Sequence, residues 1–343
     1  PVLVHAAIDL PPFNCHSHHI PRKLYLACSD RKIKVYECPK RWDSLLVGSR
    51  YKSLRCLNES IQSSVPMCME IMHRGDGGGG GSGDEEGGEA STMPYLWIGE
   101  SSGDIVVRDT YNMENVVARW ERAHDDGVTC IKRIEGHNLN TVVTAGMGGK
   151  INLIDPTRIG RKIDANHQSL RTAFHMSNGV LALDWSDNRH SLYTGDYSQH
   201  VKVWDPFVRK STGSLGTHGS TGHRSNLLDI ICNDAKNQLI TTDVSGIVKV
   251  WDTRTLRCIQ TMRDTEQDYL DHPGRLTSVC ALDEMGNLLT GGRAIHRWNC
   301  LGAKIERETR ASRPKHATRV KGRREEEVEN GGGSGSSNIS QGS

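Results

Sequence analysis

The chain contains many short segments in which apolar and polar residues alternate, each bounded by turn-forming residues. Alternation with a period of two over four to eight residues predicts half-buried β-strands. One stretch predicts four such strands: LLDIIC at 227–232, QLITTD at 238–243, IVKVWD at 247–252 and RCIQTM at 257–262. The connections between them, such as NDAKN and VSG, are short. This stretch therefore predicts a four-stranded antiparallel meander.

The same pattern recurs along the chain. The pentapeptide VKVWD occurs at 201–205 and again at 248–252, and weaker copies end at residues 37, 109, 155 and 299. Successive copies are therefore 72, 46, 50, 47 and 47 residues apart. A period of about 40 to 50 residues is typical of propeller blades. The sequence predicts an all-β fold, a β-propeller of about six recognisable four-stranded blades, over residues 1–302.

Two segments are expected to lie outside the blades. The long first step contains RGDGGGGGSGDEEGGEAST at 74–92, between predicted strands at 65–72 and 95–101. We expect this acidic, glycine-rich insertion to be a disordered surface loop, because doubling a loop's length costs only about 0.6 kcal/mol. Residues 303–343 are charged and then rich in Gly and Ser. They predict a disordered tail.

A His about 30 residues before a Trp-Asp pair resembles the pattern of the WD-repeat β-propellers. The best match is Gly222-His223 with Trp251-Asp252. Looser copies pair His124 with Ile154-Asp155, His175 with Trp204-Asp205, and His272 with Trp298-Asn299. The resemblance implies WD-type blades and a propeller that is part of a seven-bladed or double ring. The chain begins with Pro1 in place of Met, so we expect it to be a segment of a longer product.

The resemblance also implies a buried hydrogen-bonded chain within each blade. Its members are a His, a Ser or Thr on the second strand, an Asp in the following turn and the Trp. The residues assigned to this blade network are His223, Thr241, Trp251, Asp252, Trp204 and Asp205. Ser245 and Ser198 stand where the acid belongs, and only Asp30 in the first unit keeps it. We therefore expect a weakened network.

Composition limits the classes of partner. The net charge is only +2, so bulk electrostatics favour neither nucleic acid nor a membrane surface. The ten cysteines form no CxxC pair, and no long apolar run is present in the sequence. Both observations favour reduced cysteines in the cytoplasm, with the nucleus as the alternative.

The function implied by the resemblance is that of a non-catalytic scaffold in a multi-subunit assembly, with proteins or peptides bound on the propeller faces. The expected contact residues lie in turns that precede first strands or join second to third strands. They are Asp30, Arg31, His124, Asp125, Arg224, Arg275 and Arg293. Arg is often enriched among residues that dominate binding energy.

A finer similarity concerns residues 223–262, which look like blades of large WD-repeat proteins associated with cilia and flagella. It implies an axonemal scaffold. The alternative is a nuclear or cytoplasmic factor that contacts RNA or chromatin through its basic tail. This tail contains nine Lys or Arg residues but only two Glu between 304 and 324. The tail has no interleaved aromatic residue for base stacking.

Catalytic interpretations have little support. Cys15-His16-Ser17-His18-His19 contains soft metal ligands, but it lies in a predicted turn where neighbouring side chains point in different directions. His124-Asp125-Asp126 resembles half of an acid–base pair, but it matches the start of a blade. We therefore expect no catalytic residues, no metal and no cofactor. A propeller enzyme would require a carboxylate or His cluster at the central channel.

Overall fold

A computed structural model describes most of the predicted blades. The described residues are 2–9, 23–38, 46–47, 50–51, 54–72, 94–136, 139–159, 170–205, 208, 210–217, 222–263, 278–282, 287–291, 295–298 and 304–308. Within these ranges the regular structure is β-strand, with two short 3-10 turns, η2 (Pro156–Arg158) and η4 (Asp234–Lys236). The predicted all-β class is confirmed.

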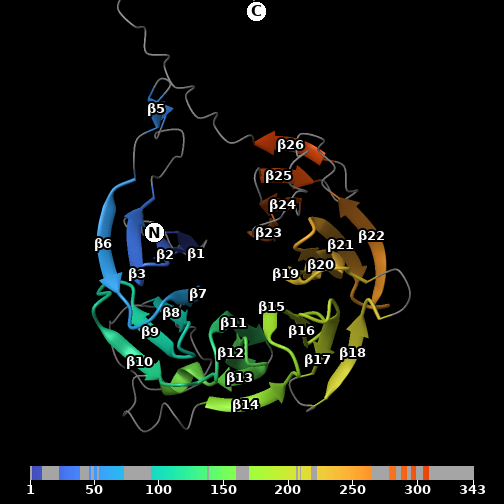
Figure 1. The fold of residues 1–343 in the computed structure, drawn as a ribbon, viewed down its shortest axis with the longest axis horizontal. Coiled ribbons are helices and arrows are strands. Elements are labelled where there is room, and N and C mark those ends of the chain that lie inside the picture. The colour runs from blue at the N-terminus through green and yellow to red at the C-terminus, as the bar shows by residue number, and fades with distance from the viewer. Residues whose placement is uncertain are drawn as a thin grey trace, which may run out of the picture. The chain divides into compact units, whose positions relative to one another are not determined.

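Six antiparallel sheets of four strands each follow one another in chain order (Figure 1). Their strands are β1 (Leu3–Asp9), β2 (Lys23–Cys28), β3 (Lys32–Glu37) and β6 (Cys56–Ile61) in the first sheet; β7 (Pro66–Met72), β8 (Tyr95–Glu100), β9 (Ile105–Asp109) and β10 (Val116–Trp120) in the second; β11 (Val128–Gly136), β12 (Leu139–Gly146), β13 (Lys150–Ile154) and β14 (Leu170–His175) in the third; β15 (Val180–Ser186), β16 (Ser191–Asp196), β17 (Val201–Trp204) and β18 (Ser211–Leu215) in the fourth; β19 (Leu227–Asn233), β20 (Gln238–Asp243), β21 (Ile247–Asp252) and β22 (Arg257–Arg263) in the fifth; β23 (Ser278–Leu282), β24 (Leu288–Gly291), β25 (Ile295–Trp298) and β26 (Lys304–Glu308) in the sixth. A separate pair, β4 (Leu46–Val47) and β5 (Arg50–Tyr51), lies between β3 and β6 in sequence.

The blade boundary after the sixth sheet lies later than expected. Strand β26 (Lys304–Glu308) completes the sixth sheet, and the compact unit extends to Glu308. Strand β26 thus lies beyond the predicted boundary at 302, and its charged residues pair as an outer strand that can stay solvated on one side. The predicted insertion at 74–92 and the rest of the predicted tail lie outside the described residues.

Every sheet has the same irregularity at the start of its first strand. The register shifts between the first and third residues of the strand, for example between Val180 and Ala182 and between Leu227 and Asp229. An extra residue of this kind is a β-bulge, which turns later side chains to the other face. Residues of different blades can therefore be equated by their register partners.

Adjacent blades pack face to face through their apolar side chains. The inner strands β1, β7, β11, β15, β19 and β23 are successive neighbours. One cluster joins Tyr193 and Val203 of the fourth blade to Leu239 and Trp251 of the fifth. This inter-blade core holds each sheet against the next one in sequence.

Candidate functional site

The sheets share one end at which first strands begin and second strands turn into third strands. We call this end the turn face; its segments are 29–31, 62–65, 101–104, 122–127, 147–149, 176–179, 197–199, 223–226 and 244–246. The connection between the first and second blades bonds to turns of both, since Gln62 N donates to Arg31 O of the first blade and Ser101 N of the second blade donates to Val65 O, each at 2.8 Å. The turn face is therefore a hydrogen-bonded surface that links successive blades.

The fifth blade contains a complete buried polar chain below the turn face. The Trp251 indole N–H donates to Thr241 Oγ1 at 2.8 Å, and Thr241 Oγ1 lies 2.6 Å from His223 Nε2. His223 Nδ1 lies 2.7 Å from Asp243 Oδ2. A neutral His223 with its proton on Nδ1 satisfies every group in this chain, which matters because an unpaired buried polar group costs about 1 to 3 kcal/mol.

The expectation of a missing acid is corrected by Asp243. This carboxylate lies two residues before Ser245, at the end of β20. Its Oδ1 accepts from Ser245 N and Ile247 N, both at 3.0 Å, and from Ser245 Oγ at 2.6 Å. Asp243 thus holds both the tight turn and His223, and the network of this blade is not weakened.

The fourth blade uses Met176 where a His was expected. Trp204 Nε1 donates to Thr194 Oγ1 at 2.7 Å, and Thr194 Oγ1 donates to Met176 Sδ at 3.4 Å. His175 is exposed on β14, so its assignment to this network is wrong. The buried acid is Asp196, which accepts from the backbone N–H and hydroxyl of Ser198.

The third blade replaces the indole with an amide. His124 Nε2 lies 2.9 Å from Thr144 Oγ1, and Asn152 Nδ2 approaches His124 Nε2 at 3.4 Å and donates to Ala123 O at 2.7 Å. Ile154 occupies the position of the Trp. Gly146 occupies the position of Asp196, so this blade offers no carboxylate to His124 Nδ1.

His124 is buried, contrary to its expected role as an exposed contact residue. Its side chain points into the blade because it belongs to the polar chain with Thr144. Burial lowers the pKa of His124 to about 4, with a smaller contribution from Lys150. His124 is therefore neutral at pH 7, and the surface residue at this position is its neighbour Asp125.

The second blade carries a Gln–Arg pair instead of the His and Trp. Gln62 lies four residues before Pro66, as His223 lies four before Leu227. Arg108 Nε donates to Gln62 Oε1 at 3.1 Å, and Arg108 Nη1 donates to Met113 O at 2.7 Å. This pair satisfies its polar atoms without the residues typical of the repeat.

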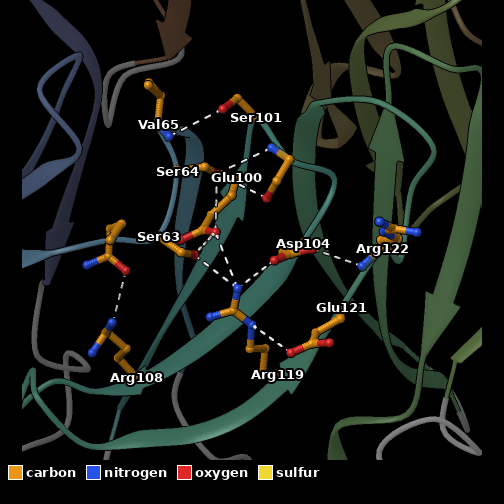
Figure 2. Close-up of polar contacts among 12 residues, drawn as sticks. Ser63, Ser64, Val65, Glu100, Ser101, Asp104, Arg108, Arg119, Glu121 and Arg122 are labelled. Atoms are coloured by element: carbon orange, nitrogen blue, oxygen red, sulfur yellow. Dashed lines mark hydrogen bonds and ion pairs between the residues drawn. The ribbon is translucent and has the colours of Figure 1, made fainter.

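An acidic side chain lies buried beside this pair on the turn face (Figure 2). Glu100 Oε2 accepts from Ser63 Oγ at 2.6 Å and from Ser64 Oγ at 3.3 Å. Arg119 Nη2 donates to Ser63 Oγ at 3.0 Å and to Asp104 Oδ2 at 2.5 Å, and Arg122 N donates to Asp104 Oδ1 at 2.8 Å. The cluster joins the first-to-second blade connection to the turn after β8.

Four of the expected contact residues lie exposed on the turn face. Asp30 accepts from Lys32 N at 3.3 Å, and Arg31 follows with a positive φ of 64°. Asp125, with 64% of its side chain exposed, pairs with Lys150 at 2.7 Å, and Arg224 follows the buried His223. Arg275, Arg293 and the cluster Cys15-His16-Ser17-His18-His19 lie outside the described residues.

Two residues assigned to the blade network have other positions. Asp252 Oδ1 accepts from Arg254 N at 2.7 Å and Thr255 N at 3.1 Å, so it caps the turn between β21 and β22 at the opposite end of the sheet. Asp205 follows β17 at the same end, where its carbonyl accepts from Val208 N at 3.0 Å. Neither Asp252 nor Asp205 takes part in the hydrogen bonds that join the His to the Trp of a blade.

The inner strands place three ionisable side chains at one register position. Glu70, Lys132 and Asp184 pair with the equivalent residues Trp97, Val143 and Tyr193 of the second strands. Lys132 Nζ lies 3.1 Å from Asp184 Oδ1, and Cys232 N donates to Asp184 Oδ2 at 2.7 Å. Burial raises the pKa of Glu70. Sequence reasoning did not place this carboxylate cluster.

The remaining chemistry is that of protonated thiols. Burial raises the pKa of Cys130 to about 12 and holds that of Cys68 well above its usual range. Within the described ranges no group of three or more His, Cys, Asp or Glu side chains is arranged to hold a metal ion. No helix of the described part of the chain is long and apolar enough to cross a membrane.

Sequence reasoning missed Gln62, Met176, Asn152 and Asp243. A positional signal was present for two of them, because the residue four before each first strand enters the blade whatever its type. Asp243 is signalled by its place at the end of QLITTD, which matches Asp196 at the end of SLYTGD. Asn152 carries no such signal.

Comparison with known proteins agrees with this arrangement. The family model for the WD domain, G-beta repeat, matches residues 168–205. Among many solved structures of similar fold is a chain of the crystal structure of the mitotic checkpoint complex, 14% identical, with a TM-score of 0.58, covering 84% of this chain and 77% of that chain. No similar sequence was found among the curated proteins.

Residues 168–205 therefore match a WD repeat, and the chain shares the fold of that solved structure. The matched residues run from β14, the outer strand of the third sheet, through the first three strands of the fourth. The sequence repeat thus extends over two neighbouring blades. Both findings support the class of a protein-interaction scaffold.

Proposed function

We propose that this chain is a non-catalytic scaffold that binds other proteins or peptides through its turn face. The observation that supports this most is that the turn face combines internally hydrogen-bonded polar residues with exposed charged neighbours. The buried polar side chains of the third to fifth blades form hydrogen bonds within the protein, for example His223 with Asp243 and Thr241. The neighbouring residues Arg31, Asp125 and Arg224 project into solvent, where they are accessible to a partner.

The test compares charge reversals on the two ends of the sheets. Arg31→Glu with Arg224→Glu changes the turn face, and Lys236→Glu with Arg254→Glu makes the same charge change at the opposite end. We expect the first pair to reduce recovery of native partners from cell extract at least tenfold, about 1.4 kcal/mol, and the second pair to leave it unchanged. Equal recovery with both variants would assign binding to another surface.

The finer proposal places the scaffold in the cytoplasm, within a ciliary or flagellar axoneme. It rests on the resemblance of residues 223–262 to blades of large ciliary WD-repeat proteins. A fluorescent fusion is expected to label the axoneme, and affinity purification to recover tubulin and dynein-arm components. Recovery of RNA-binding proteins alone, with nuclear fluorescence, would support the alternative of a nuclear factor.

The nucleic-acid alternative rests on the basic residues after the sixth blade. Deleting residues 309–343 leaves β26 intact and removes most of the tail. We expect partner recovery to be unchanged by this deletion. A large loss whose size falls steeply with salt concentration would instead indicate binding of phosphate groups.

A further inference from the structure

The turns between second and third strands divide the turn face into a polar and an apolar part. The residue that directly follows the second strand is Ser29 in the first blade and Ser101 in the second. At the same position the third, fourth and fifth blades carry Met147, Tyr197 and Val244, which we call the apolar arc. The inner strands of these three blades contact one another in order, so the apolar arc extends over neighbouring blades.

The apolar arc is accessible at the surface. Tyr197 is 43% exposed, and Met147 and Val244 are half-buried. The core clusters that the structure describes for these blades include none of the three. A Tyr side chain combines a large apolar ring with a polar tip, which favours it at protein interfaces. The arc therefore offers apolar contact area that the described core does not use.

Backbone hydrogen bonds hold both ends of the arc in place. Met147 N donates to Gly127 O at 2.9 Å, and Val244 N donates to Asn226 O at 3.0 Å. Each acceptor belongs to the connection that leads into the first strand of the same blade. A surface that is already fixed in its bound shape loses little conformational entropy when a partner binds.

A positive charge lies at the Val244 end of the arc. Arg224 is exposed in the connection that precedes β19. The next residue, Ser225, accepts from Ser245 N at 3.2 Å, so this connection is bonded to the turn that carries Val244. Arg224 can therefore reach an acidic group of a segment that covers Val244.

Negative charge dominates at the Met147 end. A Cβ at Gly148, next to Met147, would lie 3.6 Å from Asp125 Cβ and 3.8 Å from Asp126 Cβ. Lys150 pairs with Asp125 at 2.7 Å, so two carboxylates share one cation there. The apolar arc thus extends from a negative end to a positive end.

We propose that the apolar arc binds a short peptide segment of a partner protein, in which apolar side chains stand between a basic residue and an acidic residue. This inference rests on the proposed scaffold function and specifies the chemistry of the partner. The apolar side chains cover Tyr197 and its neighbours, the basic residue pairs with Asp126, and the acidic residue pairs with Arg224. The opposite charges at the two ends fix the direction in which the segment binds.

Selection of random peptides displayed on phage against the full chain tests this chemistry. We expect the selected peptides to share apolar positions between one basic and one acidic position. A fluorescent copy of the tightest of these peptides then serves as the probe, and its dissociation constant is measured by fluorescence anisotropy.

Two substitutions in the site are compared with two outside it. Tyr197→Ser introduces the residue type that the first two blades carry at this position, and it is expected to weaken binding of the probe about tenfold or more. Arg224→Glu is expected to do the same. The matched controls are Ile259→Ser, since Ile259 is 54% exposed on β22, and Arg254→Glu at the opposite end of the sheets. Both controls are expected to bind the probe like the wild type.

A charge exchange tests the contact with Arg224 directly. A probe whose acidic residue is replaced by Lys is expected to bind Arg224→Glu more tightly than it binds the wild type. A merely structural effect of Arg224→Glu would not produce this reversal. Circular dichroism verifies that each variant keeps the fold.

Three outcomes would overturn the inference: no peptide is selected, the selected peptides share no apolar position, or the probe binds Tyr197→Ser as tightly as the wild type. Recovery of native partners from cell extract separates such a result from the scaffold function. If Arg31→Glu with Arg224→Glu lowers that recovery and Tyr197→Ser does not, the scaffold function stands and the apolar arc is not its contact.

Discussion

A single hydroxyl joins the two signature residues of the fifth blade. Thr241 accepts the indole N–H of Trp251 and lies within hydrogen-bond distance of His223. The next residue, Thr242, is equally buried, but its hydroxyl has no hydrogen-bond partner among the described residues. Two adjacent threonines on one strand therefore differ in what their hydroxyls do, and their side chains point to opposite faces of the sheet.

Replacing each of these threonines with valine separates packing from hydrogen bonding. Thr241→Val leaves the Trp251 and His223 nitrogens unpaired and is expected to lower the free energy of unfolding by about 1 to 3 kcal/mol. Thr242→Val removes a hydroxyl that makes no bond and is expected to be neutral or slightly stabilising. Urea denaturation of both variants measures the difference, and equal losses would contradict the role given to the Thr241 hydroxyl.

His124 predicts a pH dependence of stability. Burial lowers its pKa in the folded protein to about 4, below the usual 6.5, so the unfolded chain binds a proton that the folded protein excludes. The stability contribution is therefore fully present above pH 6.5 and is lost as the pH falls towards 4. The loss amounts to about 3 kcal/mol.

The control for this titration is His124→Gln, since Gln62 occupies the equivalent position in the second blade. Denaturation measured from pH 7 to pH 4 should show a steeper loss for the wild type than for the variant. Parallel curves would mean that His124 stays accessible to protons in the folded protein.

At the scale of elements, the tight turns between second and third strands need particular backbone shapes. Gly103 follows β8 with a φ of +85°, and a Cβ there would lie 2.2 Å from the carbonyl oxygen of His124. That carbonyl belongs to the connection into the third blade, whose His124 N also donates to Gly103 O at 3.0 Å. The backbone of the turn therefore packs directly against the backbone of the connection.

Alanine substitution tests this fit. Gly103→Ala is expected to destabilise the protein by about 1 to 3 kcal/mol, because it combines an unfavourable φ with a backbone clash. Gly127→Ala adds its Cβ 3.5 Å from the nearest atom, an ordinary contact, and is expected to change stability by less than about 1 kcal/mol. Thermal denaturation compares the two; similar melting temperatures would show that the turn can relax.

The elements themselves were largely predictable from alternation and turn residues. Strands β20 (Gln238–Asp243) and β21 (Ile247–Asp252) coincide with the predicted segments. The inner strands were less regular, since the β-bulge places the covered apolar residues of β19 three apart, at Leu227 and Ile230, and not two. Alternation therefore located this strand without indicating which face each side chain joins.

The site was less predictable because its residues are defined by position and not by type. Met176 fills the place of a His, and Gln62 with Arg108 fills that of a His with a Trp. A search for the typical residue types finds the fifth blade and passes over these substitutes. Their hydrogen bonds depend on register partners, which become visible only when the strands are paired.

At the scale of the whole molecule, Asp184 connects three blades. From the fourth blade its carboxylate pairs with Lys132 of the third and accepts from Cys232 N of the fifth. Only 10% of its side chain is exposed. The family match, which extends over two neighbouring sheets, describes the same property of the fold: one repeat contributes to two blades.

Removing this carboxylate should weaken the propeller as a unit. Asp184→Ala is expected to lower the free energy of unfolding by about 2 to 4 kcal/mol, since it leaves a buried N–H and a partly buried Lys132 without their acceptor. Asp125→Ala removes the exposed partner of Lys150 and is expected to have little effect. Comparable losses in urea denaturation would indicate that Asp184 does not connect the blades energetically.

The hairpin of β7 and β8 gives the chain a convenient place for a genetic reporter. Met72 and Tyr95 are register partners, so the sheet is already closed where the glycine-rich insertion departs, at the end opposite the turn face. A fluorescent or affinity module inserted there would lengthen a connection between two paired strands, which costs little free energy. The location of this propeller in living cells could then be followed with every residue of the turn face unaltered.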